Sequence, residues 1–351
     1  MSLTTSLPLA TTLAELRSGQ RDLLTFIREV CDRIDALEPR IQAFLPEPDR
    51  ASRLLAQATD LQQRFPDPAQ RPLLYGALLG VKDIFRADGF STQAGSQLPS
   101  TLFAGPQASS VTRLREAGAL VVGKTVTTEF AASEPGPTRN PHNVEHTPGG
   151  SSSGSAAAVT AGFCSLALGT QTVGSVIRPA TFCGIVGFKP TYGRIEASGV
   201  IPYAPSVDTI GLMTQDVAGI ELVASLLCHA WNETVLKNIP TLAVPDGPYL
   251  AQTSPEALDA FEQQLTLLAN TGYTIKRVRA LGDIQAINLR HQHHLANAEM
   301  AQVHETWFAT YESLYRPGTA ERIRAGQTVS KEHLMQARAG RAHLRVELED
   351  L

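Results

Sequence analysis

The apolar positions of the first 65 residues recur at helical spacing. Thr12 and Glu15 match the S/T-x-x-E capping box, and an amphipathic stretch follows. The same period continues to about Gln62, which predicts an N-terminal helical region over residues 1–65. Three prolines between Arg64 and Pro72 predict a turn or short linker after it.

From Leu73 the pattern changes to short apolar, Gly-rich segments separated by polar stretches. Strands that alternate with helices predict an α/β fold with a largely buried sheet. We therefore expect a core region over residues 73–213. The apolar segments are Leu73–Phe85, Ala119–Gly123, Ala156–Gly169 and Gly184–Lys189.

Residues 240–351 are predicted to be mainly helical. Ser254 followed by Pro255 is typical of a helix start, and a strand is expected at Tyr273–Val278. A final helix from about Ser330 has no stop signal before Leu351, so we expect that the fold lacks its C-terminal part. The prediction is one domain over 1–351.

Composition narrows the function classes. The chain is 43% hydrophobic and 18% charged with a net charge of -4, and no block of basic residues suggests nucleic-acid binding. Neither a leader peptide nor a membrane-spanning stretch is apparent, which predicts a cytoplasmic protein without a membrane partner. Four scattered cysteines predict buried, reduced thiols; they are Cys31, Cys164, Cys183 and Cys228.

Two short motifs match well-known sites but lie in the wrong context. Gly118–Thr125 fits the nucleotide-binding pattern G-x-x-x-x-G-K-[ST], but its middle residues Ala-Leu-Val-Val predict a buried strand rather than a phosphate loop. Gly150–Gly154 fits the G-x-S-x-G nucleophile elbow, but loop residues precede it instead of a strand. We reject both interpretations.

Three segments carry candidate chemistry. Apolar neighbours around Lys82 would partly desolvate its amine and lower its pKa, although a solvated surface lysine is the commoner case. The run Thr147–Ser155 is either a flexible Gly/Ser linker or a tight loop that feeds a helix. The small-residue turn Gly169–Ser175 is either structural or a place where backbone N–H groups converge as an oxyanion hole.

Taken together and in this order, the three segments resemble the amidase signature family. Ser151 and Ser175 are 24 residues apart, which suits that family's Gly/Ser-rich signature. Residues 182–193 and the stretch from Asp208 to Gly211 are similar to it as well. The resemblance implies a central mixed β-sheet covered by helices on both faces. Arginine three positions after Ser175, together with the loop from Asn140, is most similar to malonamidase.

The resemblance also implies a mechanism. Ser175 would be the nucleophile, Ser151 the proton relay and Lys82 the base, with an acyl-enzyme intermediate and no metal or cofactor. A cis peptide bond would hold Ser151. The oxyanion hole would consist of the N–H groups of residues 172–175, which are Thr172, Val173, Gly174 and Ser175. Gly149 and Gly150 would lie against the substrate.

Two residues leave alternatives open. Val173 stands where relatives commonly have glycine, and its branched side chain would distort the hole if that position needed a positive φ. Arg178 would either pair with a carboxylate on the substrate or only fix its own loop. The cluster His291–His294 lacks further ligands at metal spacing and is interpreted as solvated.

The sequence thus predicts an amidase that cleaves a small linear carboxamide to a carboxylate and ammonia. Two alternatives stay open. One is a glutaminase-type subunit of a tRNA-dependent amidotransferase, and the other is an amidase-fold protein that has lost its chemistry. The expected partner is a small amide substrate, and the resemblance suggests a homodimer.

Overall fold

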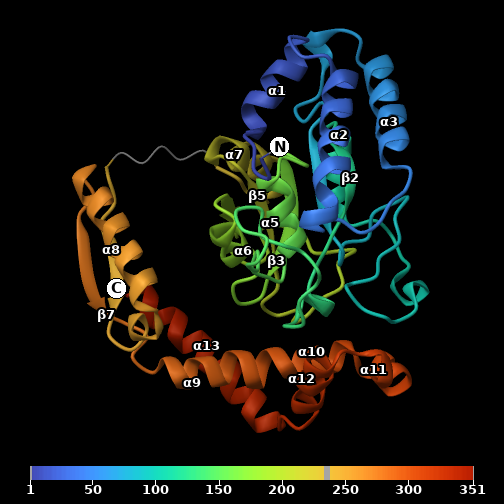
Figure 1. The fold of residues 1–351 in the computed structure, drawn as a ribbon. Coiled ribbons are helices and arrows are strands. Elements are labelled where there is room, and N and C mark those ends of the chain that lie inside the picture. Colours follow the sequence, from blue (N-terminus) through green and yellow to red (C-terminus); the bar gives the residue numbers. More distant parts are fainter. Residues whose placement is uncertain (1, 233–237, 351) are drawn as a thin grey trace. The chain divides into compact units, whose positions relative to one another are not determined.

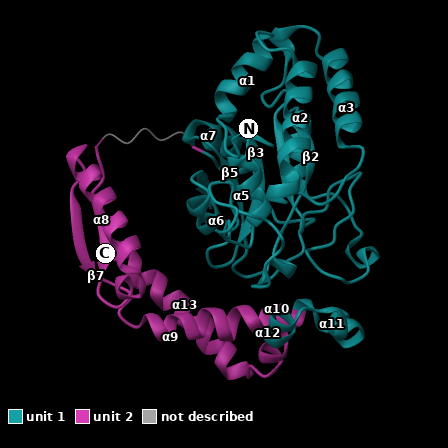
Figure 2. Ribbon diagram, in the orientation of Figure 1, with its two compact units in different colours: residues 1–231, 303–322 teal, residues 232–302, 323–351 magenta. Residues whose placement is uncertain are grey.

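The computed structural model describes residues 2–232 and 238–350. The chain forms two compact units, shown in different colours in Figure 2. The first comprises residues 1–231 and 303–322, and the second comprises 232–302 and 323–351. The prediction of one amidase domain over 1–351 stays a prediction, because it concerns the whole chain rather than its compact parts.

A five-stranded mixed sheet forms the centre of the first unit (Figure 1). The strand order is β2-β1-β3-β5-β4. Strands β1, β2 and β3 are parallel, whereas β5 runs antiparallel to both β3 and β4. The bounds are β1 (Leu78–Lys82), β2 (Leu120–Thr125), β3 (Leu166–Gln171), β4 (Val186–Phe188) and β5 (Thr209–Thr214).

Every residue of β1, β2, β3 and β5 is buried, as the apolar segments predicted. Helices flank this sheet, which confirms the predicted α/β class and mixed sheet. The flanking helices are α1 (Leu9–Ser18), α2 (Leu23–Ile41), α3 (Arg50–Arg64), α4 (Ser109–Glu116), α5 (Ser153–Thr160), α6 (Ile177–Phe182) and α7 (Val217–Leu227).

The predicted capping box at Thr12 is wrong. Helix α1 begins earlier, at Leu9, and the Thr12 hydroxyl donates to the carbonyl of Pro8 inside the first turn. The side chain of Asp216, more than two hundred residues away, accepts the Leu9 N–H at 3.0 Å. A tertiary contact therefore satisfies the helix start, and local sequence does not contain that information.

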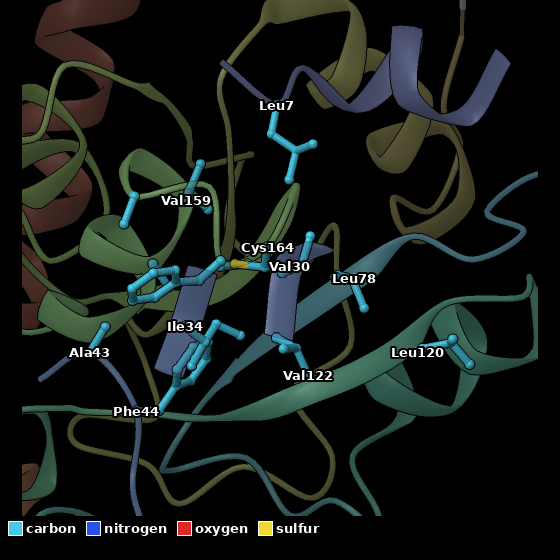
Figure 3. Packing of buried hydrophobic residues seen from close by; sticks show 14 of the residues in the cluster. Leu7, Val30, Ile34, Ala43, Phe44, Leu78, Leu120, Val122, Val159 and Cys164 are labelled. Carbon is cyan, nitrogen blue, oxygen red and sulfur yellow. The ribbon is translucent and has the colours of Figure 1, made fainter. Parts of the chain in front are cut away.

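The main core lies between the sheet and the N-terminal helices (Figure 3). Val30 and Ile34 of α2 pack toward Val122 of the sheet, and Phe44 stacks on Phe163 at 5.9 Å between ring centroids. Three of the predicted thiols, those of Cys31, Cys164 and Cys183, belong to this core, and all four cysteines are buried and free. This packing fixes the sheet whose strand ends carry the candidate site.

Residues 303–322 belong to the first unit, and hydrogen bonds to two carboxylates, one of them fully buried, join them to the rest of it. Glu129 is fully buried and accepts the Arg316 N–H at 3.1 and 3.2 Å, while Glu134 accepts the N–H of Gly318 at 2.7 Å. His304 and Tyr315 pack against the ring of Phe130. This segment contains α11 (Glu305–Tyr311) and the start of α12 (Pro317–Gln327).

The second unit contains a parallel pair of strands, β6 (Leu242–Asp246) and β7 (Ile275–Arg279), joined through α8 (Pro255–Asn270). The Ser254 side chain caps α8, and β7 overlaps the predicted strand. Ser330 caps the final helix, also as predicted. The other helical elements are α9 (Ile284–Asn288), a π-helix over Leu289–Ala296, α10 (Asn297–Val303) and α13 (Lys331–Glu349).

Candidate active site

Lys82 lies at the carboxyl end of β1 and is completely buried. Its Nζ donates to Ser151 Oγ at 2.7 Å and to Thr170 Oγ1 at 2.9 Å. Burial lowers the pKa of the Lys82 amine from its usual range to about 7, although the charge of Asp208 acts in the opposite direction. Within the described ranges, no carboxylate makes an ion pair with Lys82. Near neutral pH the amine can therefore lose its proton and act as a base.

Ser151 belongs to a tight loop that feeds α5, not to a flexible linker. Its peptide bond with Gly150 is cis, and the side chain is 1% exposed. Gly149 has φ 75°, and a Cβ there would lie 3.1 Å from the Cα of Pro179, so only glycine fits without displacement. The Ser151 carbonyl accepts the N–H of Thr128 at 3.1 Å, which ties the loop to the segment after β2.

Ser175 follows β3 on the turn that connects this strand to α6. Its side chain is buried, and its carbonyl accepts the Ser152 N–H at 3.3 Å, so the two serine loops meet directly. Gln171 holds this turn, because its Oε1 accepts the N–H groups of Val176 and Ile177 at 2.9 and 3.0 Å. In the part of the chain that the structure describes, the N–H groups of residues 173–175 make no hydrogen bond. These donors remain available for a ligand oxygen.

The distortion that a positive φ would cause at Val173 does not arise. Val173 is not among the described residues with a positive φ, and its side chain is 49% exposed. The backbone at this position is one that a β-branched residue adopts without strain. The branched side chain points into open space instead of crowding the turn.

Thr172, the first residue of the predicted oxyanion hole, is fixed from a different part of the chain. Its hydroxyl donates to Oδ1 of Asp208 at 2.5 Å. The other oxygen of Asp208 accepts the N–H groups of Tyr203 and Ala204 at 2.7 and 2.9 Å. Burial raises the pKa of the Asp208 carboxyl, whereas these three donors lower it. All three contacts are donors, which is the arrangement that suits the ionised carboxylate.

Arg178, on α6, has features of both predicted alternatives. Its Nε donates to the Gly150 carbonyl at 3.1 Å, so it does fix the serine loop. The side chain is nevertheless exposed, and its terminal nitrogens make no hydrogen bond within the described residues. A guanidinium held in this way still offers donors to a substrate carboxylate.

The structure supports the rejection of the two motif matches. Residues 120–125 form the buried strand β2, and Lys124 pairs with Asp83 at 2.7 Å instead of facing a phosphate loop. Turns rather than a strand precede Gly150.

In the described segments no group of three or more His, Cys, Asp or Glu side chains could hold a metal, and His294 stacks on His333. Across the same segments, no helix combines the length and hydropathy needed to cross a bilayer.

Sequence reasoning missed two side chains that shape this site, Thr170 and Gln171. Both lie within the small-residue segment Gly169–Ser175 that the sequence pattern indicates, but no local signal gives Thr170 a role. The contact between Thr170 and Lys82 depends on the parallel pairing of β1 with β3, which places Val81 beside Leu168. Strand register of this kind is not readable from local pattern. Gln171 did carry a signal, because a polar residue at the end of an apolar strand needs a partner.

Comparison with known proteins agrees with this geometry. The family model for amidases matches residues 25–347, so the chain belongs to the amidase family. The curated relatives include a glutamyl-tRNA(Gln) amidotransferase subunit of Salinibacter ruber, 40% identical over 218 residues, which are 60% of this chain and 42% of that protein. The corresponding protein of Geobacter sp. strain M21 is 41% identical over 287 residues, with 75% and 58% covered. The chain spans about half the length of the curated relatives it matches.

Solved structures are similar over most of the chain. A crystal structure of an amidase is 31% identical with a TM-score of 0.87, and the match covers 97% of this chain and 79% of that one. The native peptide amidase from Stenotrophomonas maltophilia is 26% identical with a TM-score of 0.78, with 96% and 79% covered. These structures are amidases. The finer resemblance to malonamidase stays a prediction.

Proposed function

We propose that this chain hydrolyses a small carboxamide to a carboxylate and ammonia through Ser175, Ser151 and Lys82. The observation that carries this proposal is the environment of Lys82. A completely buried amine, without a paired carboxylate in the described residues and 2.7 Å from a serine hydroxyl, has the properties of a base rather than of a structural cation.

In the proposed reaction Ser175 Oγ attacks the amide carbonyl and forms a tetrahedral intermediate. The proton of Ser175 passes to Ser151, and the proton of Ser151 passes to neutral Lys82. The N–H groups of residues 172–175 then stabilise the oxyanion, and one such donor typically lowers the barrier by about 3 kcal/mol. Lys82 returns its proton through Ser151 to the leaving nitrogen, ammonia departs, and water hydrolyses the acyl-enzyme.

Ammonia release is the direct test of this proposal. The wild type would be assayed with malonamate, neutral aliphatic amides, aryl amides and glutamine, beside Ser175→Ala. Ser165→Ala is a matched control, because Ser165 is a buried serine without a hydrogen-bond partner in the described chain. We expect Ser175→Ala to abolish release and Ser165→Ala to leave it unchanged. A folded wild type that releases no ammonia from any amide would instead support an amidase-fold protein without this chemistry.

A second candidate is a glutaminase-type subunit that supplies ammonia to a partner enzyme. It is favoured by the curated relatives, which are named as glutamyl-tRNA(Gln) amidotransferase subunits. Ammonia release confined to glutamine, together with a tightly co-purifying protein, would support it over a stand-alone amidase. The suggested homodimer stays a prediction, and sedimentation of the purified chain would test it.

A further inference from the structure

A carboxylate, that of Asp208, is anchored beside the proposed oxyanion turn. Asp208 directly precedes β5, and β5 runs antiparallel to β3 with Thr209 paired to Gln171. This pairing brings Asp208 to the strand edge where Lys82 and Ser175 lie, although it is far from them in sequence. The stretch from Asp208 to Gly211 resembles the amidase signature family, but the resemblance gave Asp208 no role.

The hydrogen bonds of Asp208 are divided between two loops. Oδ1 accepts the hydroxyl of Thr172, and Oδ2 accepts two backbone N–H groups from the turn at Tyr203 and Ala204. One carboxylate therefore holds the turn over residues 203–208 against the start of the turn over 172–175. If Thr172 shifted, the N–H groups that follow it would shift as well, since they share one short backbone segment.

Asp208 and Thr170 line the same cavity of about 430 Å³. The hydroxyl oxygen of Thr170 accepts a hydrogen bond from the Lys82 amine at 2.9 Å, so Lys82 lies behind the wall of this cavity. The Asp208 charge acts on Lys82 across this region and favours its protonated form.

Other polar and charged groups of the elements around Lys82 have partners of their own. Asp83, the next residue after β1, and Lys124 of β2 pair with each other at 2.7 Å. Tyr203 is hydrogen-bonded to Arg322, and Arg178 of α6 donates to Gly150. From the loop that starts α5, the side chain that contacts Lys82 is the uncharged Ser151. Among the described residues, Asp208 is the carboxylate whose charge acts on Lys82.

We propose that Asp208 is a positioning residue with two effects: it fixes Thr172 at the start of the oxyanion turn, and its negative charge acts on Lys82. This inference rests on the proposed amidase function and deepens it. It assigns no contact between Asp208 and the substrate. Both effects come from one carboxylate, but different variants separate them.

The separating variants are Asp208→Asn and Thr172→Val. Asp208→Asn removes the charge and one acceptor, so the pKa of Lys82 is expected to fall and the acidic limb of kcat/KM to move to lower pH. Thr172→Val removes the hydroxyl but keeps the charge, so the limb is expected to stay in place. In both variants kcat is expected to fall by up to about a hundredfold, because the oxyanion donors are no longer fixed.

Asp216→Asn is the matched control for a merely structural role. Asp216 also accepts two backbone N–H groups, from Leu9 and Gly219, and caps α7. Its loss is expected to lower the unfolding temperature without moving the acidic limb. If Asp208→Asn behaves in the same way as Asp216→Asn, the proposal is overturned and Asp208 has a structural role only.

A second measurement does not depend on catalysis. The pKa of Lys82 can be followed by NMR in protein labelled with ¹³Cε-lysine, with the resonance assigned by its loss in Lys82→Met. A lower pKa in Asp208→Asn than in wild type and Thr172→Val supports the proposal, and an unchanged pKa refutes it. An inactive wild type that still shows this difference would defeat the proposed function alone.

Discussion

The ends of β1 and β2 lie side by side in the sheet, and each carries a buried lysine in a different environment. Lys82 contacts two hydroxyl groups, whereas Lys124 contacts the carboxylate of Asp83 at 2.7 Å as well as Thr92. Burial lowers the pKa of both amines. At Lys124 the carboxylate of Asp83 opposes this through its charge and through a hydrogen bond, whereas at Lys82 Asp208 opposes it through its charge alone. The comparison teaches that burial alone does not make a lysine a base; the partner decides whether the proton stays.

The largest expected effect is the loss of activity in Lys82→Met. This change keeps most of the side-chain volume and removes the amine, so we expect ammonia release to fall by about 10⁴-fold or more, the order seen when a member of a catalytic unit is removed. Thermal unfolding should show a folded protein. Activity retained at a tenth of the wild-type level would contradict the distinction between the two lysines, because Lys82 would then be no more important for catalysis than Lys124.

The reverse is expected of Lys124→Met. It leaves the Asp83 carboxylate buried without its cation, so the free energy of unfolding is expected to fall by about 3–5 kcal/mol. Denaturant titration measures this loss. The double variant Asp83→Leu with Lys124→Met should recover most of it, because no unpaired charge remains. A double variant as unstable as the single one would argue against an ion-pair origin.

The pH dependence of kcat/KM is the next test of the difference between the two lysines. In the proposed mechanism Lys82 acts as a base when it is neutral, and burial lowers its pKa to about 7, so kcat/KM is expected to fall about tenfold per pH unit below that value and to level off above it. A profile measured at constant ionic strength would show a single acidic limb. An acidic limb whose pKa lies in the usual range of a carboxyl group would instead indicate a base other than Lys82.

The smallest expected effect concerns a third cation at this edge, the exposed Arg178. Arg178→Ala is expected to weaken kcat/KM for a carboxylate-bearing amide about tenfold more than for a neutral amide of similar size, because one exposed charged hydrogen bond contributes about 1–2 kcal/mol. Arg194→Ala is a control, since that partly buried arginine donates to the backbone carbonyls of His229 and Ala230 and not to the Gly150 loop. Equal losses on both amides would mean that Arg178 only holds the Gly150 loop.

The sequence predicted the fold class and the sheet because apolar runs report burial directly. It also separated Lys124 from a phosphate-binding lysine, since four consecutive apolar residues cannot form a phosphate loop. The proposed site residues Lys82, Ser151 and Ser175 were predicted from the resemblance, and the structure brings their segments to one strand edge.

What the sequence could not predict depends on contacts between distant segments. The bond from Thr170 to Lys82 and the anchoring of Thr172 by Asp208 follow from strand register. The start of α1 was misplaced for the same reason, because its first N–H is satisfied by Asp216. Local pattern reports which positions are buried, whereas it does not report which partner each buried polar group meets.

The strand order has a consequence for the time at which activity appears during refolding. The segments that carry Lys82, Ser175 and Asp208 come together only after β1 has paired with β3 and β3 with β5. These pairings join residues that are dozens of positions apart. Contacts of such long sequence separation form slowly, because the intervening chain must first lose its freedom. Any early collapsed state would already contain helices but not the site. Recovery of amide hydrolysis should therefore follow the slowest structural phase, and never precede it.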